Sequence, residues 1–425
     1  NGVSSGNTAL GLAGKLHIIK GIVEIGRPNQ SSKFGDIRYD ANSPACIEVH
    51  GGELKVYGRI RSAAGASLTY IQTGGKVTVI PIQKPIKTAG FDVSGSVFKM
   101  TGGELIYGGS GGNQTDGGDI RILSLNPEIT GGTIRLTGGG TDKEVLVSST
   151  SKFYNLSCEG NNQEVHLWGT PLEVSNELKI SANSKLIAQN VDLTVGGAFQ
   201  CDGKYEARGN QTIFTGTNQT ISGNASQMTF NDVVVRSVNS LTYQVPLAAE
   251  LNANLSIVST GVLDLQSSVW KLKGNLLNNG GFKTQGTGVL QLIGTERSEL
   301  RGNGDYGSIA VKKSAEVIAA NDINLHGTLY LENGNFLLDR YLLHVFQGGK
   351  IDRGATNYYV VTAGSFVSQG IKQELRQGDQ SVLFPLGLED KYTPAILNIP
   401  APGYTQNTGY VRVANISNSF GVVGD

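Results

Sequence analysis

The stretch GGELKV (residues 51–56) is the first of four similar segments in which a Gly-Gly pair precedes a short strand-like run. The other three are GGKVTV at Gly74, GGELIY at Gly102 and GGTIRL at Gly131. The steps between successive pairs are 23, 28 and 29 positions (74−51, 102−74, 131−102). This spacing matches one coil of a right-handed parallel β-helix, in which three strands alternate with three turns.

A longer repeat begins near residue 153. The segment FYNLSCEG at Phe153 resembles FNDVVVRS at Phe230 and YGSIAVKKS at Tyr306, at intervals of 77 and 76 positions (230−153, 306−230). We expect this unit to divide into three coils of roughly 25 residues. Each coil has one inward apolar row per strand and cannot bury that row alone, so neighbouring coils must stack.

Short strands, and no helices, are predicted along the whole chain. Apolar and polar residues alternate in runs bounded by Gly, Asn, Asp or Ser, as in half-buried strands. We find no sustained i, i+3, i+4, i+7 spacing of apolar residues. The runs are residues 54–57, 77–80, 134–136, 178–180, 233–235 and 329–331. Asn and Asp at the turns between such strands can form ladders from coil to coil.

The composition argues against nucleic-acid binding and against membrane insertion. The 425 residues include 59 Gly and 11 Pro, and only 16% are charged. Lys plus Arg equals Asp plus Glu, 35 each, so no net field favours nucleic acid. No apolar run approaches the roughly 18 residues that a spanning helix needs, so we expect no membrane insertion.

The tail differs from the repeats. From Asn357 onward, hydrophobic runs are joined by proline turns, with Pro385, Pro394, Pro400 and Pro402 close together. Proline removes a donor from a parallel ladder, so we predict a small antiparallel module here, in the form of a β-sandwich. The predicted organisation is therefore β-helix coils with Gly-Gly repeats at 1–150, a β-helix with the long super-repeats at 151–352, and the antiparallel module at 353–425. Since the chain begins without Met and ends in GVVGD, we expect a fragment of a longer polypeptide.

Few residues are candidates for chemistry. The loop GGSGGNQTDGGDI (residues 108–120) could wrap a Ca²⁺ ion with its carbonyls and the carboxylates of Asp116 and Asp119, although a plain long turn is the favoured interpretation. A second acidic patch, DIRYD, should place Asp36, Arg38 and Asp40 on one strand face as a solvated salt bridge. No catalytic residue and no cofactor is predicted.

The remaining chemistry-bearing residues are scattered. The five histidines are His17, His50, His166, His326 and His344, and no nucleophile-elbow, zincin, Walker or dinucleotide-binding fingerprint accompanies them. The three cysteines, Cys46, Cys158 and Cys201, are predicted to be small buried hydrophobes. Trp168, Trp270, Tyr205 and Tyr243 could stack on sugars if exposed, but Trp270 lies on an alternating strand and is expected in the core.

One cadence is familiar. It reads FYNL at Phe153, LKI at Leu178 and FTGTNQTISG at Phe214, and it is followed in the tail by FPLG at Phe384 and KYTP at Lys391. Over roughly residues 150–400 this resembles the giant repeat proteins on the cell surface of Bacteroidota, adhesins of the kind exported by the type IX secretion system. Residues 1–150 match only as generic β-helix.

The resemblance implies a non-catalytic stalk or adhesin segment, extracellular and associated with the outer membrane, that serves attachment or gliding motility. It implies the type IX secretion machinery as a partner, with surface glycans or other adhesin modules as candidate ligands. The alternative is a polysaccharide-active β-helix enzyme or a tailspike-like depolymerase, because parallel β-helices also house such enzymes. A third hypothesis is cargo or a subunit of a secretion or motility complex.

Overall fold

The structure is a computed structural model that describes residues 10–28, 35–40, 44–62, 66–81, 88–138, 144–353, 357–362, 369–388, 391–404 and 409–415. The predicted fragment ends, at residues 1–9 and 416–425, lie outside these ranges. Contacts divide the chain into two units. The first unit holds residues 1–215 and 219–228, and the second holds residues 216–218 and 229–425.

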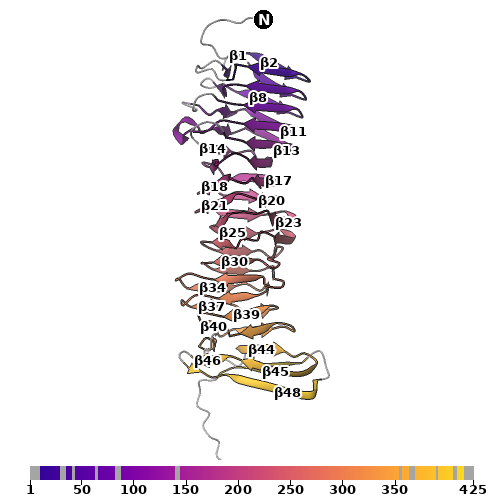
Figure 1. Ribbon diagram of the computed structural model, residues 1–425, viewed down its shortest axis with the longest axis vertical. Coiled ribbons are helices and arrows are strands. Elements are labelled where there is room, and N and C mark those ends of the chain that lie inside the picture. The colour runs from indigo at the N-terminus through magenta and orange to yellow at the C-terminus, as the bar shows by residue number, and fades with distance from the viewer. Residues whose placement is uncertain are drawn as a thin grey trace, which may run out of the picture. The chain divides into compact units, whose positions relative to one another are not determined.

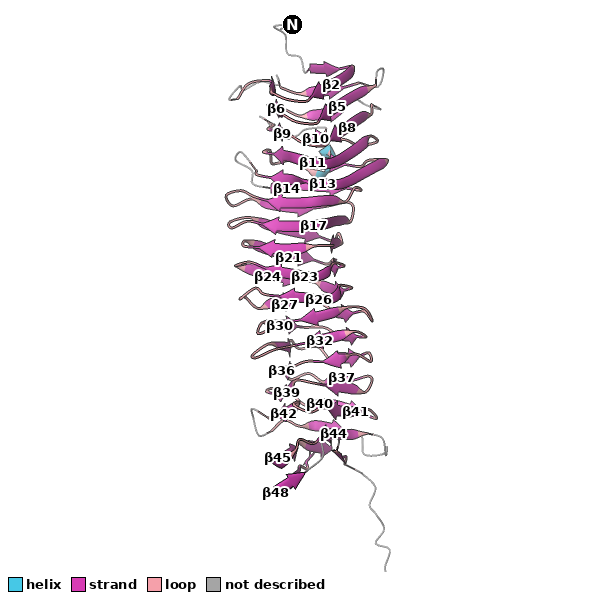
Figure 2. Cartoon of the chain, turned by 90° about the vertical axis from the view of Figure 1, so that its right-hand side faces the viewer, coloured by secondary structure: helices cyan, strands magenta, loops and turns pink. Residues whose placement is uncertain are grey.

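Both units are parallel β-solenoids, which confirms the predicted all-β class (Figure 1). The two units together hold about 15 turns. The only helix in the described part of the chain is a single 3-10 turn, η1 (Gln114–Asp116), and Figure 2 is otherwise drawn in strands and loops. Each turn contributes strands to three parallel ladders, which we call the first, second and third ladders. The backbone bonds of each ladder join one coil to the next, about 4.8 Å apart.

In the first unit, three long strands, β11 (Val97–Tyr107), β13 (Asn126–Leu136) and β17 (Leu172–Ile180), serve both the second and the third ladder. The first ladder holds β1 (Leu10–Leu12), β4 (Ile37–Tyr39), β7 (Ile60–Ser62), β10 (Phe91–Asp92), β12 (Ile120–Ile122), β14 (Glu144–Ser149), β16 (Glu164–Leu167), β18 (Lys185–Gln189) and β21 (Lys204–Arg208). The second adds β2 (Gly14–Ile18), β5 (Ala45–Val49), β8 (Leu68–Gln72), β19 (Leu193–Val195) and β22 (Gln211–Phe214). The third adds β3 (Ile22–Ile25), β6 (Glu53–Val56), β9 (Lys76–Val79), β15 (Phe153–Cys158) and β20 (Ala198–Cys201).

The second unit repeats this plan, and the division between the units falls within β23 (Thr217–Ser222) and β24 (Gln227–Phe230). Its first ladder holds β27 (Ala249–Leu251), β30 (Val269–Leu272), β33 (Val289–Leu292), β36 (Ile309–Val311), β39 (Thr328–Leu331) and β42 (Lys350–Asp352). Its second holds β25 (Asp232–Val235), β28 (Leu255–Ile257), β31 (Leu276–Asn278), β34 (Ser298–Arg301), β37 (Val317–Ala319), β40 (Phe336–Asp339), β43 (Val360–Thr362) and β46 (Leu386–Leu388). Its third holds β26 (Val238–Tyr243), β29 (Val262–Asp264), β32 (Gly281–Lys283), β35 (Asp305–Tyr306), β38 (Ile323–Leu325), β41 (Leu342–Val345) and β44 (Gly370–Glu374).

The Gly-Gly repeats lie in register, as predicted. Leu54 pairs with Val77, Val77 with Leu105, and Leu105 with Ile134, so each step equals one coil. A Cβ on the first glycine of a pair would collide with a carbonyl oxygen of the preceding coil. The second glycine has positive φ, for example +66° at Gly75. Both positions therefore exclude side chains, for different reasons.

The predicted division of the long repeat into three equal coils is wrong. Leu255 pairs with Leu276, a step of 21 positions (276−255), so the intervals between like segments are not a whole number of coils. Consequently Phe230 pairs with Leu251 in the first ladder, whereas its repeat mate Tyr306 pairs with Leu325 in the third. Both aromatic side chains are fully buried, so each of the two faces accepts the same motif.

Inward side chains form an apolar column in each unit. In the first unit, Tyr70 stacks on Phe98 with ring centroids 5.0 Å apart, and Phe91 meets both rings edge-on. In the second, Trp270 is fully buried, as predicted, between Phe230 and Tyr243. Full burial of one such side chain contributes roughly 1.5–3 kcal/mol, whereas an exposed ion pair contributes about 0–1 kcal/mol. The column is therefore the main source of stability.

Asparagine and aspartate form ladders at the turns, as the sequence predicts. In the second unit, Asp232 Oδ1 accepts from Asn254 N at 3.0 Å, and Asn254 Oδ1 accepts from Asn275 N at 3.0 Å. Asn275 Oδ1 then accepts from Glu299 N at 2.9 Å. Each side chain thus satisfies a backbone donor of the following coil, where the strand ladder is interrupted.

The tail ends in antiparallel pairing, as predicted from its prolines. β45 (Gly378–Phe384) pairs with β48 (Ala395–Tyr404) as a small antiparallel sheet, and β49 (Tyr410–Val413) pairs with β44. β47 (Lys391–Tyr392) pairs antiparallel with β46. Within the same tail, β43 and β44 still pair in parallel with β40 and β41, and β46 pairs in parallel with β43. The separate antiparallel sheet, β45 with β48, has two strands, so the tail continues the parallel coils beside it.

Candidate functional site

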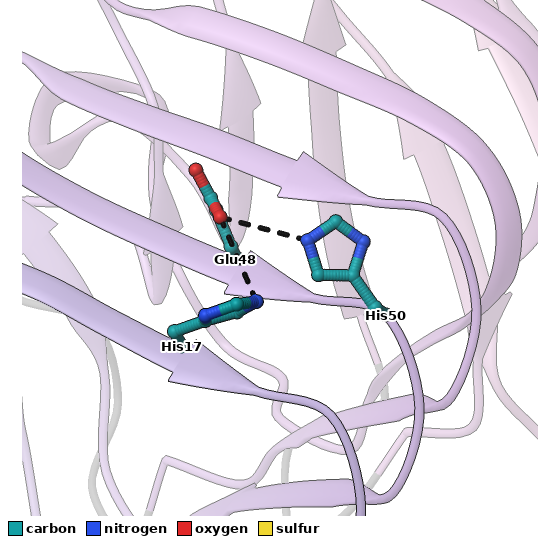
Figure 3. Close-up of side chains that lie close together, drawn as sticks. All are labelled: His17, Glu48 and His50. Atoms are coloured by element: carbon teal, nitrogen blue, oxygen red, sulfur yellow. Dashed lines mark ion pairs between the residues drawn. The ribbon is translucent and has the colours of Figure 1, made fainter.

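One cluster of metal-ligand side chains stands out on the first unit. Among the described residues, His17, Glu48 and His50 form the only group of three or more His, Cys, Asp or Glu side chains whose ligand atoms all lie within 4.8 Å of one another. Figure 3 shows both imidazole rings turned toward the carboxylate of Glu48. The two histidines are 33 positions apart (50−17) in sequence, and the fold alone brings them together.

Strand register explains the juxtaposition. His17 on β2 is the direct parallel partner of Glu48 on β5, so their side chains leave adjacent coils on the same outer face. His50 follows Glu48 by two residues and shares its face, because side chains alternate along a strand. Just beyond it, Gly51 and Gly52 form the turn, and the backbone N–H of His50 donates to Ile18 O at 2.8 Å. The turn that defines the repeat therefore also positions His50.

Both imidazoles face the same carboxylate oxygen. His50 Nε2 lies 3.5 Å and His17 Nε2 lies 3.9 Å from Glu48 Oε2. The rings meet edge to face, with centroids 5.0 Å apart and planes at 82°. Their side chains are 39% and 41% exposed, against 15% for Glu48. The cluster is thus open to solvent, with its anionic member innermost.

Lys15 is the present cationic partner of the carboxylate. Its Nζ lies 2.7 Å from Glu48 Oε2, and this hydrogen bond lowers the pKa of Glu48 and raises that of Lys15. Cys46, on the same face of β5, donates its thiol to Glu48 Oε1 at 3.6 Å. Partial burial, followed by the adjacent carboxylate, raises the pKa of the Cys46 thiol. Glu48 therefore remains anionic, whereas Cys46 is held as a thiol.

A hydroxyl of the next coil orients His50. Its Nδ1 lies 2.8 Å from Thr73 Oγ1. When Nδ1 carries the proton, the threonine oxygen accepts it, and Nε2 presents its lone pair toward Glu48. A hydrogen bond of this kind on the far nitrogen is the usual way in which a metal-ligating histidine is fixed.

The predicted calcium candidates have separate roles. The Asp119 side chain is fully buried, and its oxygens accept from Tyr107 Oη at 3.0 Å, Gly112 N at 3.1 Å and Leu146 N at 3.0 Å. Burial raises the pKa of Asp119 to about 6. Asp116 instead accepts from the Asn113 side chain at 2.7 Å within the 3-10 turn. Their hydrogen bonds do not converge on a common centre, and Asp119 holds the glycine-rich loop against the next coil.

The second acidic patch is also divided. Arg38 and Asp40 form an exposed pair, with Nε to Oδ1 at 3.4 Å. Asp36 is 5% exposed and binds the next coil, where Arg59 N donates to it at 2.8 Å and Arg61 Nε at 2.6 Å. The predicted single solvated face thus applies to the Arg38–Asp40 pair, while Asp36 joins two coils.

The other histidines lie in separate settings. His166 lies between two carboxylates, with Nδ1 3.3 Å from Glu144 and Nε2 3.2 Å from Glu164. In the second unit, His326 and His344 stack on Phe346 at centroid distances of 4.1 and 4.0 Å. Neither group brings three ligand atoms within mutual reach.

Two surface hollows differ from a glycosidase cleft in their charged groups. One, of about 190 Å³, is lined by residues that include a single carboxylate, Glu164, beside Lys185 and Lys204. The other, of about 410 Å³, contains Glu173 and Lys152 among its lining residues. Glycoside hydrolysis generally needs two carboxyl groups across one substrate site. Neither hollow supplies that pair.

Comparison with models of known protein families, with curated proteins and with solved structures finds no match for this chain. No helix in the described ranges has the length and apolarity required to cross a bilayer. Function is therefore inferred from the residues themselves.

The sequence held a signal for the histidine cluster that the Gly-Gly repeats do not reveal. Gly21 has φ +82° and occupies the place of Gly52 one coil earlier, because Ile22 pairs with Glu53. Aligning Gly21 with Gly52 places His17 opposite Glu48, as the structure has them. The first coil lacks the leading glycine of the pair, so the Gly-Gly pattern begins one coil too late to show it.

Proposed function

We propose that this chain is a non-catalytic segment of an extracellular, cell-surface stalk or adhesin, of the kind exported by the type IX secretion system. The motif cadence at Phe153 and Phe384 supports the family, and a stack of parallel coils suits a spacer because each coil needs only its neighbours. On this proposal the chain displays binding regions for surface glycans or partner modules and serves attachment or gliding motility.

The observation that carries the proposal is the pairing of outward charges across coils. Lys185 lies within 3.8 Å of Glu164 on the preceding coil and 2.5 Å from Glu206 on the following one. Arg135 bridges Glu104 and Glu159 in the same way. Although partial burial opposes it, hydrogen bonds from the neighbouring cations lower the pKa of Glu159 and Glu206, whereas a general acid at neutral pH needs a raised pKa and access to substrate.

The test has two parts. Purified protein is incubated with neutral and anionic polysaccharides, and released reducing ends and unsaturated products are measured. Beads coated with the same protein are assayed for attachment to polysaccharide surfaces and to cells. We expect attachment without cleavage. Depolymerisation at catalytic turnover would reject the proposal in favour of the tailspike-like or β-helix enzyme alternative.

Localisation is tested separately in the organism that makes the chain. Intact cells are treated with protease, and the chain is followed with an antibody. We expect cleavage at the surface, and loss of surface exposure when the type IX translocon is deleted. Protection in intact wild-type cells would contradict the assignment to the cell surface.

A further inference from the structure

We propose that His17, Glu48 and His50 form a zinc site that joins the first two coils of the chain. The proposal concerns a binding activity and is independent of the surface role above. Two imidazole nitrogens and one carboxylate oxygen are a ligand set that suits Zn²⁺, with water in the fourth position.

The distances fit a small ion. Ligand atoms about 2.1 Å from a tetrahedral zinc lie about 3.4 Å from one another. The observed separations from Glu48 Oε2 are 3.5 Å to His50 Nε2 and 3.9 Å to His17 Nε2. The ligand atoms of His17 and His50 lie within 4.8 Å of each other, so rotations of these exposed side chains need to shorten that separation by at most about 1.4 Å. The backbone needs no change, because His17 and Glu48 are already in register.

The surroundings supply what such a site requires. Thr73 Oγ1, 2.8 Å from His50 Nδ1, can accept the Nδ1 proton of the tautomer whose Nε2 binds a metal. Glu48 is anionic, and the cation now beside it, Lys15, has a side chain that is 51% exposed. Lys15 can therefore swing into solvent when a divalent ion takes its place, at little cost.

The location gives the ion a mechanical role. The coil that holds His17 exposes large apolar side chains, since Ile19 and Ile22 are each 63% exposed. A metal held by His17 from β2 and by Glu48 and His50 from the second coil ties the two coils together. Because the ion binds only the stacked arrangement, zinc should protect β2 and β5 against local opening.

Competition with Lys15 gives the proposal a distinctive signature. Lys15 Nζ and both imidazoles address the same oxygen, Glu48 Oε2. Lys15→Gln should therefore tighten zinc binding several-fold. Lys76→Gln is the matched control, because Lys76 lies 3.8 Å from Glu53 in the same unit and its loss removes one positive charge away from the site.

The experiment is calorimetric titration of the tag-free, chelator-treated chain with ZnCl₂, and with CaCl₂ as the hard-cation control. We expect one zinc per chain, at least tenfold weaker binding in His17→Ala and His50→Ala, and about tenfold weaker binding in Thr73→Val. His166→Ala should bind as the wild type does. Circular dichroism checks that each variant is folded.

Hydrogen exchange provides a second readout that does not depend on measured affinity. Zinc should slow exchange of the amides of β2 and β5 in the wild type and leave them unchanged in His17→Ala. Wild-type zinc binding no tighter than that of both histidine variants would overturn the proposal. So would unaltered exchange in β2 and β5 at saturating zinc.

Discussion

Asp119→Asn should remove a pH dependence of stability from the first unit. Burial raises the pKa of Asp119 from 3.8 to about 6, and the side chain is fully inaccessible. Between these two values the folded chain keeps a proton that the unfolded chain has lost. The contribution of Asp119 to the free energy of unfolding therefore falls as pH rises from about 4 to about 6, and it is level above that. A shift of this size corresponds to about 3 kcal/mol.

The asparagine variant is chosen because it fits the same hydrogen bonds. Its amide oxygen can accept from Gly112 N and Leu146 N, which now share Asp119 Oδ2, and its amide nitrogen can donate to the Tyr107 oxygen. Relative to wild type, the variant should thus gain about 3 kcal/mol between pH 4 and pH 7. The comparison cancels the carboxylates whose pKa values are lowered in the fold, because both proteins contain them.

The assay is urea unfolding at several pH values in a Trp270→Phe background, where Trp168 reports on the first unit. Trp168 is suitable because a Cβ placed on Gly118, next to Asp119, would lie 3.0 Å from its indole nitrogen. Asp116→Asn serves as the control for losing one negative charge from the same loop. A stability difference that stays constant from pH 4 to pH 7 would refute the reasoning.

Three further predictions concern packing. Gly75→Ala should lower the free energy of unfolding by well over about 1 kcal/mol, because φ is +66° and a Cβ would lie 2.7 Å from Gly52 O. Gly95→Ala has a similar φ of +64° but open space around the Cβ, so it should lower it by only about 1 kcal/mol in the same denaturation assay. Trp270→Ala should lower the free energy of unfolding by about 3–5 kcal/mol. Trp270→Phe should lower it clearly less, because the buried indole nitrogen has no hydrogen-bond partner among the described residues. Equal losses in the two variants would contradict this. Cys46 should be the only thiol that reacts in the native chain, and it should react slowly at neutral pH because its pKa is raised by partial burial and by Glu48. The two buried cysteines should react only after denaturation, and early labelling of all three would reject the packing.

The coil architecture was predictable because its determinants are local and repeated. A Gly-Gly pair marks a turn where one position excludes a Cβ and the next requires positive φ, so the steps from Gly51 to Gly131 report the register directly. The antiparallel pairing in the tail was predictable because proline cannot donate to a parallel ladder, so clustered prolines indicate where the regular coils end. Both signals act through backbone chemistry that the sequence displays.

The coil length in the long repeat was not predictable from its period. Sequence similarity gives the interval between like segments, whereas strand pairing depends on the number of residues in one coil. Leu255 and Leu276 show that a circuit takes 21 positions (276−255), and nothing in the repeat FYNLSCEG to FNDVVVRS reveals that number. Gly-Gly pairs recur there only at Gly196, Gly280 and Gly348, which are too far apart to mark each coil.

The histidine cluster was predictable only in part. Alternation places Glu48 and His50 on one face, but His17 joins them only when the first circuit is known to take 31 positions (48−17). The inward turn of Asp119 was beyond sequence reasoning, because it depends on Tyr107 and Leu146 from other strands.

The repeat period is not a whole number of coils, and this affects what duplication of a repeat does to the surface. A duplicated binding feature is displayed on a different face from the original. Phe230 and Tyr306 are repeat mates on different faces of one unit. The outward side chains next to such mates therefore point in different directions around the solenoid axis. A ligand approaching from a single direction therefore meets one copy, and multivalent capture favours a partner that can wrap around the unit.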